Sequence, residues 1–272
     1  MPRVSVVLPV KNGEKTIEAT VKSVLLQSYD DFNLIIVDDN STDKTDSIVE
    51  ELRSRDPRIR FIKSNAQGRI FARNLGIAQT DSEYIAAMDA DDICMPDRLL
   101  QQTNYMDADK SMAAVGSHIA WFGDKAGRPR MLTTKSECRT ALKLFSPICH
   151  PTLFMRRSAF ERCGKYIAER QLAEDYDLFC RLSFVGNIAN IPQPLLAYNI
   201  HKKQSSQEQK GQQMRDMWET LSLYHQHLLG KEKIEKKQMA MRLISAAYEL
   251  GPTHAIQSLR ALRDCFRSMK DM

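Results

Sequence analysis

Short runs of β-branched and other apolar residues alternate with amphipathic segments through roughly the first hundred residues of the chain. The runs are short enough for buried strands, and the segments between them repeat apolar residues at the spacing of one helix face. We expect strands at 4–8, 34–37, 59–62 and 84–88, and helices at about 14–27, 42–53 and 68–78. Such repeated strand and helix units predict a doubly wound α/β fold with a mainly parallel central sheet.

The pattern loosens into shorter elements from about residue 113. A strand is expected at 152–155, a helix at 174–184 and another strand near 194–198. This half is expected to close over the sheet and receive a second substrate. After residue 206, Gln, Lys, Glu, Met and Leu dominate at helical spacing, which predicts appended helices. We therefore divide the chain into a first domain of residues 1–206 and a C-terminal helical extension of residues 207–272.

Length and charge limit the classes of partner. The chain has 272 residues, of which 43% are hydrophobic, enough to bury one large core. Its 39 basic and 34 acidic residues leave a net charge of +5, which is too balanced for a nucleic-acid-binding surface. Phosphate-bearing small molecules and an acidic membrane surface remain open as partners, and so does a second copy in an oligomer.

The cysteines and the apolar runs indicate a compartment. Six cysteines lie far apart, without a CxxC pair or a zinc-type spacing to histidine, and we interpret them as reduced, mostly buried thiols. The apolar run at 4–10 is too short for a signal peptide, and no apolar stretch reaches about 18 residues. We expect a cytoplasmic protein that is soluble or peripheral at the inner face of the membrane.

Two aspartates, Asp38 and Asp39, follow the predicted strand 34–37. Ligands of open α/β sheets gather at the carboxyl ends of strands, so this position is a candidate binding site. An aspartate here can accept a hydrogen bond from the imide N–H of a nucleotide base. Ser41 and Thr42 are candidates to cap the next helix, and turn and capping chemistry alone is the competing interpretation.

A denser acidic segment, Asp89-Ala90-Asp91-Asp92, follows the predicted strand 84–88. Three carboxylates in four residues repel one another unless a cation offsets their charge. Oxygen ligands of this kind favour Mg²⁺ or Mn²⁺, held by one or two carboxylates together with substrate phosphates. An EF-hand is excluded because its glycine and glutamate positions would fall on a cysteine and a leucine. A solvated acidic turn is the competing interpretation.

A third acidic segment, Glu174-Asp175-Tyr176-Asp177, opens the predicted helix 174–184. The helix dipole alone favours acidic residues at such a position, so capping explains the segment when it is taken in isolation. Its place after the two earlier clusters favours a catalytic carboxylate instead.

Taken in order, these segments closely resemble the family 2 glycosyltransferases of the GT-A fold, which are inverting enzymes that use nucleotide-diphosphate sugars. The resemblance runs from Val4 to about Ser206. It is carried by an opening strand, a base-binding strand end, a helix motif, a metal motif and a catalytic acidic motif. In this chain they read Val6-Val7-Leu8-Pro9-Val10-Lys11-Asn12, Val37-Asp38-Asp39-Asn40-Ser41-Thr42-Asp43, Ala72-Arg73-Asn74-Leu75-Gly76, Asp89-Ala90-Asp91-Asp92 and Glu174-Asp175-Tyr176-Asp177-Leu178.

The resemblance implies roles for individual residues. Asp39 would hold the uracil or other base, and Asp89 would contact the donor ribose or the metal. Asp91 would ligate the metal, Asp175 would be the general base, and Glu174 would support Asp175 or touch the acceptor. The nucleotide site would comprise Pro9, Lys11, Asp38, Asp39, Arg69, Arg73 and Asp89.

Two departures from the family pattern stand out. Lys11 occupies a position that is often aromatic, and Asn199 stands where the family usually carries arginine. In the same segment as Asn199, His201 is a further candidate contact for the metal or the diphosphate, with a structural role as the alternative. His150 is a weaker candidate.

The implied activity is a metal-dependent, inverting transfer of a sugar, expected from a UDP-sugar with Mn²⁺ or Mg²⁺, onto a glycan or lipid-linked saccharide. Surface polysaccharide biosynthesis is the expected setting. A P-loop enzyme is excluded because no GxxxxGK[ST] motif occurs. The alternative is a sugar-nucleotide or glycan-binding module without turnover. Apolar and basic residues within 256–270 also predict an amphipathic helix that either packs on the protein or lies on an anionic membrane.

Overall fold

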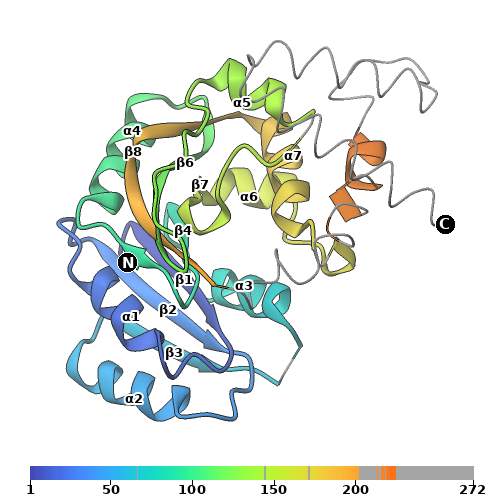
Figure 1. Ribbon diagram of the computed structural model, residues 1–272. Coiled ribbons are helices and arrows are strands. Elements are labelled where there is room, and N and C mark those ends of the chain that lie inside the picture. The colour runs from blue at the N-terminus through green and yellow to red at the C-terminus, as the bar shows by residue number, and fades with distance from the viewer. Residues whose placement is uncertain are drawn as a thin grey trace.

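One mixed sheet forms the centre of the molecule, in the order β3-β2-β1-β4-β7-β6-β8-β5 (Figure 1). The computed structural model describes residues 1–201 except 66, 144 and 171, together with residues 213, 216, 217 and 219–224. Within these residues the strands are β1 (Val4–Val10), β2 (Phe32–Asp38), β3 (Ile59–Lys63), β4 (Tyr84–Ala87), β5 (Ile93–Cys94), β6 (Met112–Gly123), β7 (Phe154–Arg156) and β8 (Asn187–Ile200). The helices are α1 (Ile17–Leu25), α2 (Thr45–Arg55), α3 (Arg69–Ala78), α4 (Arg98–Ala108), α5 (Lys135–Ala141), α6 (Arg157–Cys163) and α7 (Glu174–Val185), with short 3-10 turns η1 (His150–Thr152) and η2 (Ala168–Arg170).

The amino-terminal half has helices on both faces of its parallel strands, as predicted. Strand β1 pairs in parallel with β2 and β4, and successive side chains of β1 point to opposite faces. Val6 and Leu8 belong to the same apolar cluster as buried residues of α1 and α2, whereas Val7 packs in another cluster with Ile70 and Ile77 of α3. Figure 1 shows α1 and α2 on one side of these strands and α3 on the other.

The second half continues the sheet through an antiparallel strand. Strand β7 runs antiparallel to both β4 and β6, and β8 runs parallel to β6. Strands β1, β2, β4, β6 and β8 therefore all direct their carboxyl ends toward the same edge of the sheet. The predicted GT-A type of α/β fold with a mainly parallel sheet is confirmed, since the described strands pair in parallel at four of their seven interfaces.

Several predicted boundaries were wrong. Thr152, predicted to begin a strand, lies in η1, and β7 begins at Phe154. The helix predicted from Thr42 begins at Thr45, so neither Ser41 nor Thr42 caps it. Both residues instead bond to Asn12 of the β1–α1 turn, whose backbone amide donates to Ser41 Oγ and whose side-chain oxygen accepts from the Thr42 amide, each over 2.8 Å. The predicted capping residues therefore connect two loops at the carboxyl edge of the sheet.

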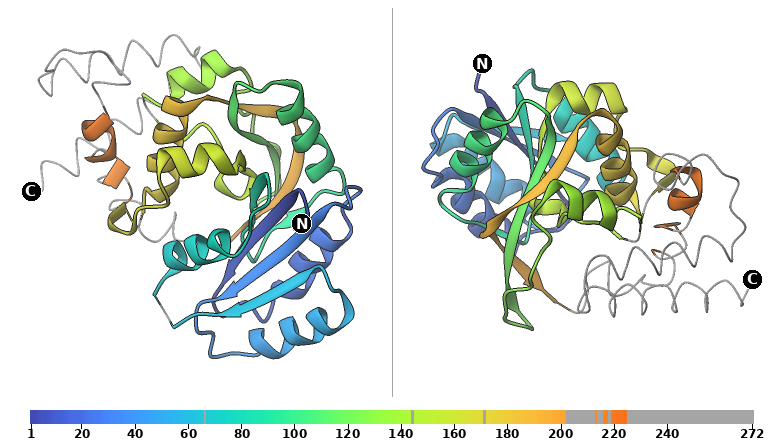
Figure 2. Two further views of the ribbon diagram at one scale, coloured as in Figure 1. Left: turned by 180° about the vertical axis from the view of Figure 1, so that it is seen from behind. Right: turned by 90° about the horizontal axis from the view of Figure 1, so that it is seen from above.

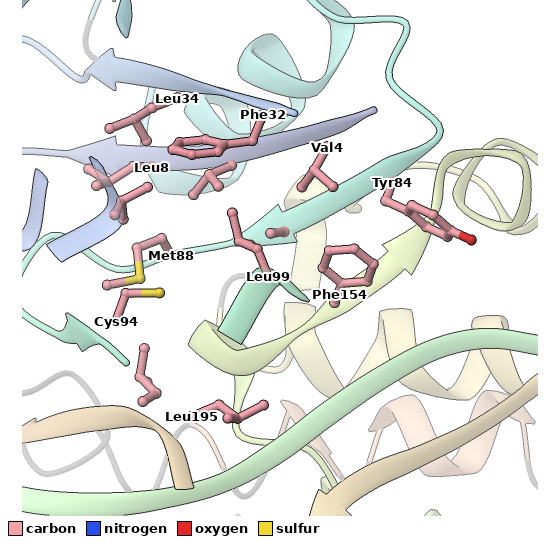
Figure 3. Packing of buried hydrophobic residues seen from close by; sticks show 14 of the residues in the cluster. Val4, Leu8, Phe32, Leu34, Tyr84, Met88, Cys94, Leu99, Phe154 and Leu195 are labelled. Atoms are coloured by element: carbon pink, nitrogen blue, oxygen red, sulfur yellow. The ribbon is translucent and has the colours of Figure 1, made fainter. Parts of the chain in front are cut away.

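A single apolar layer joins the two halves of the sheet. Figure 3 shows Leu8 and Tyr84 on the amino-terminal strands together with Leu99 of α4 and Leu195 of β8. The Tyr84 ring lies 5.0 Å from the ring of Phe154 on β7, measured between centroids. Because this core is continuous, the loops that follow β1, β4 and β8 are held in fixed positions relative to one another.

Most of the predicted extension, including the helix expected within 256–270, lies outside the described residues. Its longest described stretch, residues 219–224, is helical and contacts α7. The Tyr224 hydroxyl donates to Asp177 Oδ1 over 2.9 Å, and its ring lies 5.6 Å from that of Phe184. Among the described residues, no helix is long and apolar enough to cross a membrane, and the five described cysteines are unpaired, as expected for thiols.

Candidate active site

A cleft of about 660 Å³ opens at the carboxyl ends of β1, β2, β4 and β8. All the residues predicted from the sequence to form the site line this cleft, with the exception of Asp38. They are Pro9, Lys11, Asp39, Arg69, Arg73, Asp89, Asp91, Glu174, Asp175 and His201. The cleft wall also includes residues that sequence reasoning did not select, among them Cys149, Tyr198 and the apolar side chains of Ile148, Pro151 and Leu172.

Asp39 and Asp38 occupy different environments although they are adjacent. Asp39 accepts hydrogen bonds from the Ser64 hydroxyl over 3.1 Å and from the backbone amides of Gln67 and Gly68 over 3.0 and 3.1 Å. These bonds fix the loop before α3 against the cleft. Asp38 instead accepts from both the amide and the hydroxyl of Ser41, which closes a turn behind the cleft. The turn interpretation therefore describes Asp38, whose predicted place in the nucleotide site is not matched by its position.

The three carboxylates of the acidic segment after β4 lie in different environments. Asp92 is only 1% exposed and accepts from the Asn199 amide over 2.8 Å. Its burial and the charge of Asp89 raise the pKa of Asp92 to about 9. Asp89 and Asp91 line the cleft, and the Thr20 hydroxyl of α1 fixes the segment by donating to the carbonyls of Ala90 and Asp92. The segment is therefore a built feature of the cleft and not the alternative solvated turn.

Asp91 and His201 face each other at the metal corner predicted from the sequence. His201 Nε2 lies 3.0 Å from Asp91 Oδ2, which brings together two side chains 110 residues apart. Burial, together with the negative charge of Asp89, raises the pKa of Asp91. A divalent cation would offset this crowding of carboxylates. Because no group of three potential ligands occurs among the described residues, a cation here would also need phosphate oxygens from a substrate.

Arg73 joins the second and third acidic segments. Its guanidinium donates to Asp89 Oδ1 through Nη2 over 3.0 Å and to Glu174 Oε1 through Nη1 over 2.9 Å. Arg69, one helical turn earlier on α3, also pairs with Glu174 over 2.9 Å. Arg73 is 7% exposed and Glu174 is 4% exposed, so these charges are buried and paired. Glu174 is thus held by two arginines, in a position to support its neighbour Asp175.

Tyr166 and Asn74 hold Arg73 in place. The Arg73 guanidinium carbon lies 5.8 Å from the centre of the Tyr166 ring, and the Tyr166 hydroxyl lies 2.8 Å from Nε2 of His150. Asn74 donates to the Tyr166 carbonyl over 2.8 Å and accepts from its amide over 3.1 Å. This arrangement was not predicted from the sequence. Asn74 stood within the recognised helix motif, but nothing in the sequence links it to a loop 92 residues away.

Asp175 lines the cleft beside Glu174 at the start of α7. Its Oδ1 accepts from the Tyr176 amide over 2.7 Å. Burial and the charge of Glu174 raise the pKa of Asp175 to about 6, against the opposing effects of the Tyr176 amide and the two arginines. Asp177 points elsewhere and pairs with Arg181 one turn along the helix. The acidic segment therefore contributes more than capping, since each carboxylate has its own partner.

A pKa near 6 suits a general base, because Asp175 is then ionised at neutral pH and is still basic enough to take a proton. Two further groups, the thiol of Cys149 and the phenol of Tyr198, also line the cleft, and burial raises the pKa of both. They therefore stay protonated at neutral pH. The cleft thus combines one poised base, a buried cation between two acids, and a corner suited to a divalent ion.

Comparison with known sequences gives a consistent assignment. The model of the family described as "Glycosyl transferase family 2" matches residues 5–164. An uncharacterized glycosyltransferase of Haemophilus influenzae is 30% identical over 75% of this chain and 68% of its own length. An Escherichia coli protein named UDP-Glc:alpha-D-GlcNAc-diphosphoundecaprenol beta-1,3-glucosyltransferase WfaP is 37% identical over 40% of this chain and 43% of its own length.

Solved structures share the fold at low sequence identity. Staphylococcus aureus TarS 1-349, in complex with UDP-GlcNAc, superimposes with a TM-score of 0.66 at 17% identity, covering 98% of this chain and 89% of TarS 1-349. The mannosyltransferase PcManGT from Pyrobaculum calidifontis, in complex with GDP-Man and Mn²⁺, gives a TM-score of 0.64 at 17% identity, covering 98% and 86%. The family model spans the ends of β1 and β2 as well as the acidic segment after β4. The chain therefore belongs to glycosyl transferase family 2.

Proposed function

We propose that this glycosyltransferase moves a sugar from a UDP-sugar to a hydroxyl of a lipid-linked saccharide, with inversion at the anomeric carbon and with Mn²⁺ or Mg²⁺. The observation that carries the proposal is the position of Asp175, a base with a raised pKa in the same cleft as the paired Asp91 and His201. A catalysed transfer requires such a base. A binding module without turnover, the alternative, would not need one.

The end of the cleft near Asp39 suits the base of a nucleotide. Pro9 lies near the carboxyl end of β1, Lys11 follows β1 and Asp39 follows β2, and all three line the cleft. The Asp39 carboxylate is already fixed by two backbone amides, which preorganises the wall at little entropic cost on binding. UDP is favoured because TarS 1-349 was solved with UDP-GlcNAc and the related E. coli enzyme is named for UDP-Glc.

The metal corner suits a diphosphate. Asp91 supplies an oxygen ligand and His201 a nitrogen ligand, a set that accommodates Mn²⁺ and Mg²⁺, and PcManGT was solved with Mn²⁺. Asp89 lies within the same segment, with its Oδ1 occupied by Arg73. A bound divalent ion would offset the charge that develops on the departing diphosphate. Arg73, which contacts Asp89, and Arg69 add positive charge to the lining of the cleft.

The transfer is a single displacement. The acceptor hydroxyl oxygen forms a bond to the anomeric carbon while the bond from that carbon to the diphosphate oxygen breaks. Asp175 takes the hydroxyl proton, and the nucleoside diphosphate leaves with the bonding electron pair. Attack from the face opposite the leaving group inverts the anomeric configuration. Arg73 and Arg69 both pair with Glu174, which fixes the start of α7 where Asp175 lies. The negative charge of Glu174 also raises the pKa of Asp175.

The acceptor is assigned by analogy with the E. coli relative, whose name specifies a diphosphoundecaprenol-linked saccharide. A carrier of that kind would place the reaction at the cytoplasmic face of the membrane and within surface polysaccharide biosynthesis. The apolar wall made by Ile148, Pro151 and Leu172, close to Asp175 in the cleft, is suited to packing against the faces of acceptor sugar rings.

We expect UDP to stabilise the protein only when Mn²⁺ or Mg²⁺ is present, because Asp89 and Asp91 otherwise repel the diphosphate. Thermal unfolding should show a rise in Tm with UDP and Mn²⁺ together that exceeds the sum of the two separate effects. Asp91→Asn should remove the metal-dependent part of the rise. In the presence of metal, Asp39→Ala should weaken binding of the nucleotide with or without its sugar.

Asp81→Asn serves as a matched control, because Asp81 is exposed and precedes β4 at the opposite edge of the sheet. It should keep the full metal-dependent rise. Equal stabilisation by UDP with and without metal would contradict the metal assignment. If Asp39→Ala showed the same rise in Tm with UDP as the unaltered protein, the proposed role of Asp39 in binding the nucleotide base would be contradicted.

A further inference from the structure

The end of β6 extends past the body of the protein on the edge that carries the cleft. Strand β6 points the same way as β1, β2 and β4, so residues 121–130, which we call the basic tip, lie beyond the carboxyl edge of the sheet. The right-hand view of Figure 2 shows this end of β6 and its turn projecting from the rest of the fold beside β8.

The basic tip has a defined shape. Its turn is closed by the Trp121 amide, which donates to the Gly127 carbonyl over 2.7 Å, and the Lys125 ammonium lies 4.3 Å from the centre of a Trp121 ring. Gly123 has a φ of +87°, and a Cβ there would lie 2.6 Å from the Ile200 carbonyl oxygen. The glycine thus allows β6 and β8 to run closely together up to the projection.

The side chains of the basic tip combine positive charge with an exposed aromatic ring. Lys125, Arg128 and Arg130 are all exposed, and Asp124 is the one acidic residue of the segment. Phe122 keeps 36% of its surface exposed. Cations beside an exposed aromatic ring are the composition of surfaces that bind anionic lipid headgroups, where the ring enters the interface.

The basic tip adjoins the mouth of the cleft. Trp121 pairs with Tyr198 and Gly123 pairs with Ile200 in the β6–β8 register. Tyr198 and His201 both line the cleft. A surface that held the basic tip would therefore lie next to the part of the cleft that contains Tyr198, His201 and Asp91.

We propose that the basic tip docks on an anionic membrane surface and presents the cleft to acceptors that are anchored there. This inference rests on the proposed lipid-linked acceptor, because a saccharide joined to a lipid through a diphosphate stays near the headgroups. A bilayer is favoured over an acidic protein because the tip is a small convex projection. Such a projection enters a soft headgroup layer readily, but offers little area to a rigid partner.

The test is binding of the full-length protein to vesicles of phosphatidylcholine with about one third phosphatidylglycerol, measured by flotation at low salt. The variant carries Lys125→Gln, Arg128→Gln and Arg130→Gln. Removing three cations near an anionic surface should lower the partition coefficient on the order of a hundredfold, and high salt should lower that of the unaltered protein as well. Phe122→Ser should lower it further.

The matched control carries Lys22→Gln, Arg53→Gln and Arg55→Gln, three exposed cations on α1 and α2. It loses the same net charge and should keep vesicle binding within about threefold. Equal losses in the two triple variants would reduce the effect to net charge and overturn the proposal. So would absence of binding to anionic vesicles, or unchanged binding of the basic-tip variant.

The response to UDP and Mn²⁺ separates this inference from the proposed function. The basic-tip variant should keep the metal-dependent rise in Tm and should keep its activity on a soluble saccharide diphosphate without vesicles. Loss of activity on the soluble acceptor would mean that the three cations bind the acceptor diphosphate, which would overturn membrane docking. Failure of UDP to bind any form would instead count against the proposed function.

Discussion

Asp175→Asn is expected to lower the rate of sugar transfer at least about a hundredfold, which is the usual contribution of a general base. Asparagine is nearly isosteric and can keep the bond from the Tyr176 amide, so the start of α7 should stay folded. The proposed donor site includes Asp39 and Asp91, which follow β2 and β4 and not α7, so donor affinity should change little. Steady-state transfer rates and UDP binding measured on the same preparation provide the comparison.

The pH dependence adds an independent readout. The base acts in its ionised form, and burial and Glu174 raise the pKa of Asp175 from 3.8 to about 6. Activity of the unaltered enzyme should therefore fall about tenfold per pH unit below about pH 6, whereas an ordinary aspartate would hold it down to about pH 4. The residual activity of Asp175→Asn should lack this acid limb. Normal turnover by the variant would reduce Asp175 to a helix cap.

Of the substitutions proposed here, Arg73→Met is expected to lower the free energy of unfolding most, by about 3 kcal/mol or more. Methionine can fill the space over Tyr166, but it leaves the buried Glu174 and the nearby Asp89 without the cation that joins them. Removing one partner of a buried ion pair costs far more than removing an exposed pair. Urea unfolding at neutral pH, followed by circular dichroism, measures the difference.

Arg69→Met is the matched control, because Arg69 contacts the same Glu174 but its side chain is 40% exposed. Its loss of stability should be well below half that of Arg73→Met, since water solvates the site it leaves. If the two variants lose the same stability, Arg73 is not the cation that compensates the buried acids. Arg73→Met with near-normal stability would contradict the account of the network.

Local sequence patterns predicted the parts of the fold that rest on local chemistry. The strands β1, β2 and β4 are largely apolar runs, β3 carries a shorter apolar pattern, and α1 to α3 carry one apolar face each, so their order and both helix layers could be predicted. The second half was harder. Strand β6 is rich in small residues such as alanine and glycine, and β8 contains two prolines, so neither has the composition typical of a strand. The pairing of β6 with β8 also shifts its register where His118 meets Pro194.

The site could be predicted residue by residue only where the family motifs supply each position. Ten of the eleven predicted residues line the cleft, but the sequence did not distinguish Asp38 from Asp39, because both end the same strand. Their difference arises from partners, Ser41 for one and Gly68 for the other. The pairing of Arg73 with Glu174 spans 101 residues, so periodicity and local motifs carry no signal for it.

The most direct measurement is ¹H NMR of the anomeric protons during a reaction of the full-length protein with UDP-sugars, a lipid-diphosphate-linked saccharide and Mn²⁺. The account predicts UDP release together with a new glycosidic signal of the opposite anomeric configuration, so that an α-linked donor gives a β-linked product. Chelation of the metal and Asp175→Asn should each abolish this signal. A product that retains the α configuration, or transfer that continues at full rate without the metal, would contradict the proposed mechanism.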